Sequence, residues 1–246
     1  MTMYNSHFLF EYFATMWLNK EQITDIALRA YRQQLLQHRP RHVVIDHLFN
    51  SSQLEQVLSQ LQQEDCWQTQ KHTYDKLYVD DKKWQTTPEP ERFVKRDLWL
   101  RSNLASGSNL AQAFLDYLRS EEFLKLLSRL FKVQLTDKNV ANPAVNTNYF
   151  RLGSSDFVHQ HADDSPGREV CMLLYLNKDW QAHQGGDLVF QGQDNNTIAI
   201  APLFNRCVLF DPASPGAEHW VKAVNAVNSG SAASYRYNVT SWYWSE

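Results

Sequence analysis

The stretch YRYNVTSWYW, residues 235–244, is predicted to be a β-strand because polar and apolar side chains alternate along it. Successive side chains of a strand point to opposite faces, so the alternation sorts these residues into two sets. One set holds Arg236, Asn238 and Thr240, and the other holds Tyr237, Val239 and Tyr243. The polar set must face either solvent or a cavity that contains a partner for the arginine, because an unpaired buried charge is costly.

This strand is the last of eight short runs of similar texture that follow residue 142. Gly, Pro and Asn residues separate the runs, as expected for turns between strands. Regularly spaced short strands of this kind are typical of a sandwich or jelly roll. We therefore expect a double-stranded β-helix, a cupin-like jelly roll, over residues 142–246. The runs are VNTNYFRL (145–152), FVHQHAD (157–163), REVCMLLYLN (168–177), DLVFQ (187–191), TIAIA (197–201), RCVLF (206–210), HWVKAV (219–224) and YRYNVTSWYW (235–244).

The first half of the chain is dominated by helical periodicity. Four helices are predicted, with Asn19 capping the first and a serine capping the second: residues 19–36, 51–63, 108–118 and 120–131. The first helix is expected to bury a face made of Ile23, Ile26, Ala27, Ala30 and Tyr31. Strands are predicted at 41–49 and 92–101. The charged segment 72–91 is predicted to be a long loop that closes over substrate.

These patterns predict an α+β fold, mainly β, in which N-terminal helices buttress the jelly roll. We expect one catalytic domain over residues 1–246. Residues 1–141 would supply helical and strand support together with the substrate loop, and residues 142–246 would form the barrel core.

Composition excludes several classes of partner. The net charge is −3 and the basic residues are scattered, so no nucleic-acid partner is expected. The apolar run HFLFEYFATMWL (7–18) is interrupted by Glu11 and is too short to span a bilayer, so we expect a packed helix or strand there and no membrane partner. Three cysteines without CxxC spacing favour a reducing, cytoplasmic location. The oligomeric state is not predicted.

The stretch FVHQHADDSPG, residues 157–167, concentrates candidate metal ligands. His161 and Asp163 are two positions apart, so both side chains point to one face of a strand. An imidazole and a carboxylate on one face are two of the three ligands of the facial triad that holds Fe(II). The third is expected from a later strand, where His219 is a better candidate than His183 in its turn. On spacing alone, a polar turn between two strands remains the alternative.

The inward arginine of the last strand predicts an anionic ligand. A guanidinium donates two parallel hydrogen bonds to a carboxylate, and the hydroxyls of Tyr175 and Thr240 are placed to assist Arg236. Residues predicted to face substrate are Tyr149, Arg151 and His159. Residues predicted to pack in the core are Cys171, Cys207, Trp242 and Trp244.

Residues 148–244 resemble the Fe(II)/2-oxoglutarate-dependent dioxygenases, in particular their prolyl-hydroxylase-like branch. The motifs that carry this resemblance are YLNKDW (175–180), GGDL (185–188) and RYNVTSWYW (236–244). All three follow His161 and Asp163, and the last also follows His219, in the order found in the HIF prolyl hydroxylases and their bacterial relatives. The resemblance implies that His161, Asp163 and His219 bind iron. It also implies that Arg236 pairs with the distal carboxylate of 2-oxoglutarate, assisted by Tyr175 and Thr240.

The resemblance implies an oxidoreductase that consumes 2-oxoglutarate and O2, releases succinate and CO2, and is supported by ascorbate. Asp163 favours hydroxylation, because related halogenases replace this carboxylate with a small residue. Three functions stay open. The first is hydroxylation of a prolyl or other residue in a protein or peptide. The second is oxygenation of a free amino acid or small metabolite. The third is a cupin-like binding or sensing module without turnover.

Overall fold

A computed structural model of the chain describes residues 17–63, 65–76, 79–101, 109–136, 143–194, 196–225 and 235–245. The predicted packing of the run 7–18 falls outside these residues except at Trp17 and Leu18, which are buried. Before the barrel the elements are η1 (Lys20–Ile23), α2 (Asp25–Gln37), β1 (His42–Asp46), α3 (Ser51–Gln63), β2 (Trp67–Thr73), α4 (Asp81–Thr86), η2 (Glu89–Glu91), β3 (Arg92–Trp99), α5 (Leu110–Tyr117) and α6 (Glu121–Phe131).

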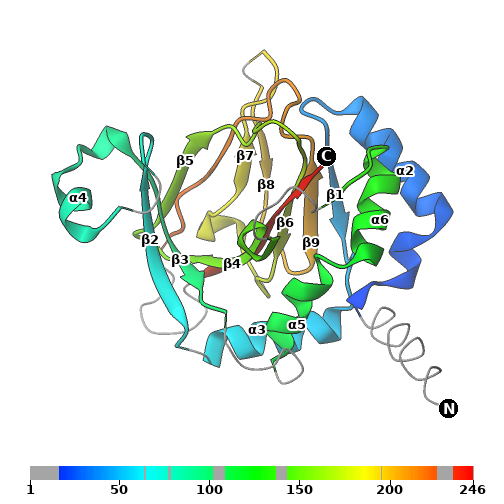
Figure 1. The fold of residues 1–246 in the computed structure, drawn as a ribbon, viewed down its shortest axis with the longest axis horizontal. Helices are drawn as coiled ribbons and strands as arrows, with labels where there is room; N and C mark the ends of the chain where they lie inside the picture. The colour runs from blue at the N-terminus through cyan, green and yellow to red at the C-terminus, as the bar shows by residue number, and fades with distance from the viewer. Residues whose placement is uncertain are drawn as a thin grey trace.

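The barrel itself contains all eight predicted C-terminal strands. They are β4 (Thr147–Leu152), β5 (Phe157–His161), β6 (Arg168–Tyr175), β7 (Leu188–Phe190), β8 (Ile198–Ile200), β9 (Arg206–Phe210), β10 (His219–Val221) and β11 (Arg236–Trp244), with η3 (Pro143–Asn146) before β4 and η4 (Ala182–Gln184) before β7. All the named strand pairings are antiparallel, in the order β1-β9-β6-β11-β4-β3-β5-β10-β7-β8. The predicted jelly roll is confirmed (Figure 1).

Strand β3 joins the two halves of this sheet. One edge of β3 pairs with β2 along its length. Its other edge pairs first with β5, where Val94 is opposite Val158, and then with β4, where Leu98 is opposite Phe150. Residues from the first half of the chain therefore close the barrel that the second half forms.

The half of the sheet that contains β11 packs against a different layer on each of its two faces. Its outer face is covered by helices, with α2 and α6 along β1 and β9, and α3 and α5 at one end (Figure 1). Tyr237, Val239 and Tyr243 of β11 lie in this helix-covered core. The opposite face of β11 lines a cavity inside the barrel, so the alternation predicted for this strand is confirmed.

Four local predictions need correction. The predicted helix 19–36 is two elements, because the Thr24 side chain accepts a hydrogen bond from Ala27 N and caps a new helix at Asp25. That helix buries Leu28 and Leu35, whereas Ile26 is 81% exposed. Helix α3 is capped by Asn50, not by a serine, since the Asn50 Oδ1 accepts from Gln53 N.

The fourth correction concerns the segment 72–91, which was predicted to be a loop. It begins inside β2, a strand that periodicity did not reveal, and it contains the helix α4 with Asp80 as its cap. No helix among the described residues is long and apolar enough to cross a membrane.

His72 gives the fold a pH dependence that can be measured. The side chain is buried on β2, and burial, with a smaller effect from the charge of Arg96, lowers its pKa from 6.5 to about 4. The unfolded chain therefore binds a proton here at a pH where the folded chain does not, and the stability present above pH ~6.5 is lost as the pH falls toward about 4.

We expect the free energy of unfolding to fall between about pH 7 and about pH 5. The variant His72→Gln should reduce that fall by about 1 kcal/mol, allowing for partial screening by solvent. Urea unfolding at both pH values provides the measurement, and His183→Gln, at an exposed histidine, is the matched control. An identical fall in His72→Gln and wild type would contradict the assignment.

Candidate functional site

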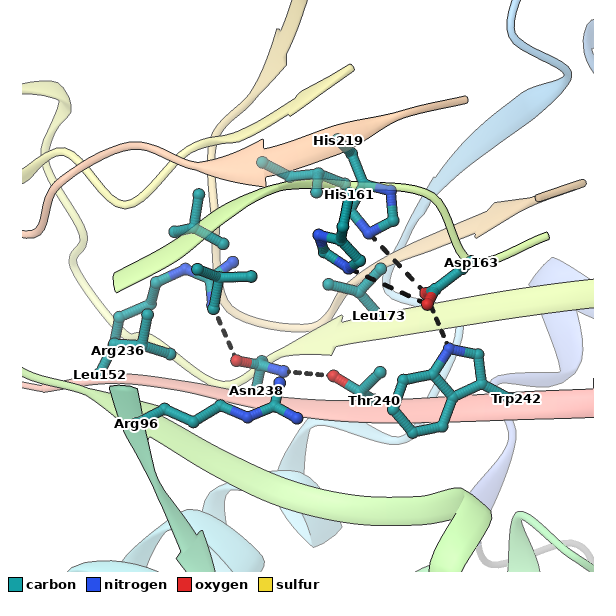
Figure 2. A pocket seen from close by; sticks show the side chains of 13 residues that line it. Arg96, Leu152, His161, Asp163, Leu173, His219, Arg236, Asn238, Thr240 and Trp242 are labelled. Carbon is teal, nitrogen blue, oxygen red and sulfur yellow. Dashed lines mark hydrogen bonds and ion pairs between the residues drawn. The ribbon is translucent and has the colours of Figure 1, made fainter. Parts of the chain in front are cut away.

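Two neighbouring strands bring the predicted histidine ligands together. His161 at the end of β5 is paired with His219 at the start of β10, and their ring centroids are 4.2 Å apart. The carboxylate of Asp163, two residues beyond His161, completes the group (Figure 2). His161 Nε2 lies 3.9 Å from Asp163 Oδ1, and His219 Nε2 lies 3.8 Å from Asp163 Oδ2. All three ligand atoms lie within 4.8 Å of one another, so one metal ion can contact all of them.

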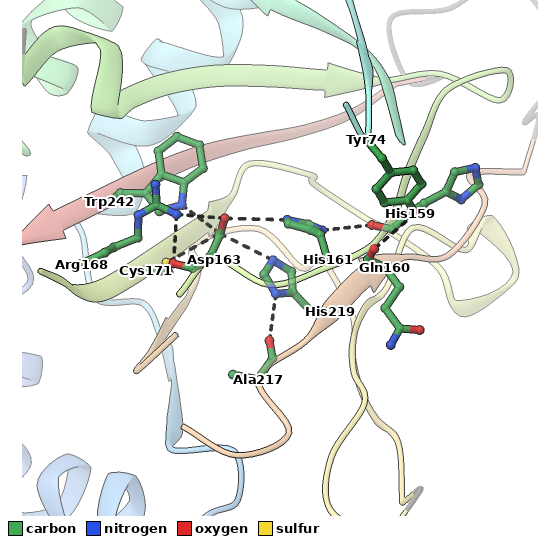
Figure 3. A network of polar contacts seen from close by, with 10 residues as sticks. All are labelled: Tyr74, His159, Gln160, His161, Asp163, Arg168, Cys171, Ala217, His219 and Trp242. Carbon is green, nitrogen blue, oxygen red and sulfur yellow. Dashed lines mark hydrogen bonds and ion pairs between the residues drawn. The ribbon is translucent and has the colours of Figure 1, made fainter. Parts of the chain in front are cut away.

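Both imidazoles are oriented by the same local device. His161 Nδ1 is 2.9 Å from the backbone carbonyl of His159, and His219 Nδ1 is 3.0 Å from that of Ala217 (Figure 3). A carbonyl only accepts, so each Nδ1 must carry the proton and donate it. The lone pair is thereby placed on Nε2, the atom that faces Asp163, which is the arrangement expected of histidines that ligate a metal.

Burial keeps the second histidine neutral. His219 is packed between the rings of Phe190 and Phe210, whose centroids lie 5.9 and 5.1 Å from its own. Burial, reinforced by the neighbouring His161, lowers the pKa of His219 to about 4. At neutral pH this imidazole is therefore available as a ligand without first losing a proton.

The carboxylate of Asp163 is held through both oxygens. Arg168 Nη1 donates to Oδ1 at 3.1 Å and to the Asp163 backbone carbonyl at 2.9 Å, while Trp242 Nε1 donates to Oδ2 at 2.8 Å (Figure 3). Burial raises the pKa of Asp163, but the two imidazoles, Trp242 and Arg168 together outweigh it, and the net pKa is lowered. The group is thus an ionised, oriented ligand.

Arg236 lies deeper in the same cavity, which we call the inner pocket. The guanidinium is 1% exposed; its Nε donates to the carbonyl of Gly186 at 2.7 Å and its Nη1 donates to Asn238 Oδ1 at 2.7 Å. Gly186 has a φ of +73°, and a Cβ there would lie 2.9 Å from the Arg236 Cδ. This glycine of the GGDL motif therefore gives the arginine the room that it occupies.

Two polar atoms beside this arginine lack hydrogen-bond partners among the described residues. They are Arg236 Nη2 and the hydroxyl oxygen of Tyr175, whose ring lies under the guanidinium with its centroid 4.8 Å from Cζ. Thr240 also lines the pocket, and its Oγ1 accepts from Asn238 Nδ2 at 2.9 Å (Figure 2). Buried donors are normally satisfied, so this end of the pocket suits an anionic acceptor such as a carboxylate.

The residues predicted to face substrate are not all in the pocket. On β4 the pocket-facing set is the other one: Leu152 lines the inner pocket, whereas Tyr149 is in the helix-covered core and donates to the Ala111 carbonyl. Arg151 pairs with Asp97 at 3.0 Å outside the pocket. This placement differs from the prediction for Tyr149 and Arg151, because the pocket-facing residues of β4 are one position out of phase with them. His159 is exposed and stacks on Phe157 with centroids 4.5 Å apart.

Sequence reasoning missed functional contacts at two residues assigned to packing. Trp242 hydrogen-bonds Asp163, and the alternation 236, 238, 240 could have been extended to it. The Cys171 thiol lies 3.6 Å from Asp163 Oδ2, a proximity that spacing could not reveal. Arg168 directly follows the Pro166-Gly167 turn, which brings its side chain back to Asp163. The turn is visible in the sequence, but the contact that it produces is recognised only once the structure is known.

A second cavity, the outer pocket, adjoins the first. Its volume is about 360 Å³, and it shares Arg96 and Trp242 with the inner pocket. Its remaining lining residues are Gln70, Leu98, Trp99, Leu100, Arg101, Val145, Asn148 and Phe150. None of the described residues in 72–91 lines either pocket, although the Tyr74 hydroxyl donates to the Gln160 carbonyl beside His161 (Figure 3). Closure of that segment over substrate stays a prediction.

Residues 146–244 match the 2OG-Fe(II) oxygenase superfamily. No curated protein is similar enough in sequence to count as a relative. Solved structures with a similar fold include a Pseudomonas putida prolyl-4-hydroxylase (16% identity, TM-score 0.60, 89% of this chain and 99% of that chain). A prolyl hydroxylase in complex with a hypoxia inducible factor oxygen degradation domain peptide fragment, from Trichoplax adhaerens, is also similar (20% identity, TM-score 0.62, 98% of this chain and 94% of that chain).

A 2OG-Fe(II) oxygenase family oxidoreductase from Burkholderia pseudomallei is similar as well (14% identity, TM-score 0.58, 90% of this chain and 92% of that chain). At these identities the structural likeness establishes the fold alone. Together with the sequence match over residues 146–244, it confirms the resemblance predicted from the motifs.

The hydrogen bond from Trp242 to Asp163 can be removed without removing the ring. We expect Trp242→Phe to weaken binding of Co(II), used as a redox-stable probe, by about tenfold, because partners that orient metal ligands are worth about 10- to 100-fold in metal affinity. Trp244→Phe is the matched control, since the Trp244 ring N–H has no hydrogen-bond partner among the described residues. Equal Co(II) affinity in the two variants, measured by absorbance titration, would show that the bond does not orient Asp163.

Proposed function

We propose that the chain is a 2-oxoglutarate/Fe(II)-dependent dioxygenase, because residues 146–244 match the 2OG-Fe(II) oxygenase superfamily, and that it hydroxylates a C–H bond of a prolyl or other residue in a protein or peptide. Succinate and CO2 are the proposed co-products. The observation that carries this proposal is the coexistence in one pocket of three convergent metal ligands and a buried arginine with an unused donor.

The residues of the pocket fit the cofactors that the family implies. His161 and His219 offer neutral Nε2 atoms, and Asp163 adds one negative charge, a donor set suited to Fe(II). Arg236 and Tyr175 are proposed to hold the distal carboxylate of 2-oxoglutarate, with Thr240 beside them. Bound Fe(II) would supply the oxidising chemistry together with 2-oxoglutarate and O2.

The protein's own residues orient the ligands bound in the pocket and exclude water from it. The wall between the metal ligands and Arg236 is apolar, formed by Leu152, Val158, Leu173, Leu188 and Val221. Such a wall strengthens the charge interactions inside the pocket, because fewer water molecules compete for the same groups. Since Asp163 occupies the carboxylate position, no room is left for a halide ligand there, which supports hydroxylation.

A polypeptide substrate is supported by the outer pocket. Its volume of about 360 Å³ lies within the range of roughly 300–1,000 Å³ that accommodates drug-sized ligands, and it adjoins the inner pocket directly. The Trichoplax prolyl hydroxylase, whose fold is similar, binds a peptide fragment. Oxygenation of a free amino acid is the competing outcome of the assay below.

Further proposals concern the domain organisation, the use of ascorbate, the location and the partners of the protein. We propose one catalytic domain over residues 1–246, with ascorbate supporting turnover. The three cysteines are free, which fits the proposed reducing, cytoplasmic location. No nucleic-acid or membrane partner is proposed.

The experiment that tests the proposed function is succinate release by purified protein with Fe(II), 2-oxoglutarate and ascorbate, against panels of peptides and of free amino acids. We expect turnover to be stimulated by peptides and the peptide to gain one oxygen atom by mass spectrometry. Asp163→Ala should abolish turnover while the fold persists, whereas Asp164→Ala, at the exposed neighbour, should retain it. Stimulation by free amino acids only would reassign the substrate, and the reverse pattern in the two variants would reassign the ligand.

Arg236 provides a separate test of the cosubstrate. Removing one partner of a buried, charge-assisted pair costs on the order of 3 kcal/mol, so Arg236→Ala should weaken 2-oxoglutarate binding roughly a hundredfold. Arg236→Lys keeps the charge but not the paired donors and should fall between Ala and wild type. The measurement is a 2-oxoglutarate titration at constant Fe(II), with Co(II) affinity as the control that should not change. Unchanged 2-oxoglutarate affinity in Arg236→Ala would place the anchor elsewhere.

A further inference from the structure

Two of the exposed large apolar side chains in the described part of the chain border the outer pocket. Leu100, directly after β3, is 44% exposed, and Val145 of η3 is 55% exposed. Leu98 of β3 and Trp242 of β11 are partly buried and line the same cavity. Apolar side chains that stay in contact with water and are grouped at a cavity are typical of a ligand-binding site.

The two arginines in the wall of the outer pocket are already engaged within the protein. The guanidinium carbon of Arg96 lies 3.4 Å from the centroid of the Phe150 ring. Arg101 Nη2 donates to the Thr147 carbonyl at 2.7 Å, and Arg101 Nη1 contacts Asp116 Oδ1 at 3.3 Å. Because neither guanidinium is free, recognition of a ligand in this pocket is expected from its apolar side chains.

The outer pocket and the inner pocket lie on one face of the sheet. Asn238 of β11 is opposite Phe150 of β4, and Phe150 is opposite Leu98 of β3, so one row of cross-strand neighbours runs from the inner pocket to the outer pocket. Trp242, which hydrogen-bonds the metal ligand Asp163, lines both pockets (Figure 2). The surface that receives the reacting residue therefore continues into the apolar outer pocket.

The spacing of the strands sets the distance between two groups bound in these pockets. Neighbouring strands are about 4.8 Å apart, so the two strand steps from Asn238 to Leu98 cover roughly 10 Å. An extended polypeptide advances about 3.3 Å per residue, so about three residues bridge that distance. A peptide whose reacting residue occupies the inner pocket can thus place the side chain of a nearby residue in the outer pocket.

We propose that the outer pocket binds a large aliphatic side chain, such as Leu or Ile, of the substrate polypeptide, about two to four residues from the hydroxylated residue, and that Leu100 and Val145 are specificity-determining residues. This inference rests on the proposed polypeptide hydroxylase function. It adds a chemical requirement on the substrate that the metal site and the 2-oxoglutarate site do not impose.

The test uses fluorescein-labelled nine-residue peptides of Gly and Ser with a central proline and one Leu, Gln or Glu placed at each of the flanking positions in turn. Binding is measured by fluorescence anisotropy to the full chain loaded with Mn(II) and 2-oxoglutarate. At a position about two to four residues from the proline, we expect the Leu peptide to bind about tenfold more tightly than the Gln peptide, which is about 1.4 kcal/mol. The Glu peptide should bind no more tightly than the Gln peptide.

A pair of double variants makes the assignment specific to the outer pocket. In the variant with Leu100→Gln and Val145→Gln, the preference for Leu over Gln should disappear. The matched control carries Ile26→Gln and Leu36→Gln, at two exposed apolar residues of α2 that do not line the outer pocket, and should keep the preference. Because all four side chains are exposed, both double variants should fold like the wild type.

The possible results separate this inference from the proposed function. Equal binding of the Leu and Gln peptides, tightest binding of the Glu peptide, or no binding by any of them overturns the inference, even if succinate is released with other peptides. A Leu preference that survives in the Leu100 and Val145 double variant, or that is lost equally in the control, also overturns it. A Leu preference without any succinate release supports the apolar subsite and overturns the hydroxylase function. Free leucine competing as well as the Leu peptide would overturn the polypeptide part.

Discussion

The site is organised around one buried negative charge, the carboxylate of Asp163. A buried carboxylate is tolerated only where donors and cations surround it, and here Arg168 and Trp242 satisfy its two oxygens while two imidazoles face it. The donors come from β6 and β11 and the imidazoles from β5 and β10, so the charge can be stabilised only when four strands are correctly assembled. The electrostatics of one side chain are in this way tied to the closure of the barrel.

Much of the site could be predicted because strand alternation and ligand chemistry act locally. The pair His161 and Asp163 and the set Arg236, Asn238 and Thr240 follow directly from side-chain parity on single strands. The eight C-terminal strands follow from turn residues and short apolar runs, for the same local reason. Their assembly into a jelly roll was predictable only at the level of the class.

What could not be predicted depended on which face of a strand is covered, and by what. Tyr149 and Arg151 lie on the face of β4 that is turned away from the pocket. The sequence of β4 does not show which face that is, because the large aromatic residues Tyr and Phe are adjacent and so lie on opposite faces. Ile26 is exposed although it fits the periodicity of a helix that begins at Asn19. A new helix begins after the cap Thr24, and the face that this helix buries contains Leu28 and Leu35. Arg96 lies on a strand that periodicity located, yet its guanidinium packs on the ring of Phe150, more than fifty residues away in sequence.

The double pairing of β3 has a consequence for dividing the chain. A fragment from residue 142 onward would keep every metal ligand and Arg236, but it would lack the strand that pairs with β4 and with β5. Both strands would then present unpaired backbone N–H and C=O groups, the kind of open edge through which β proteins associate with one another. Expressed separately, the half of the molecule that carries the chemistry would be prone to aggregate.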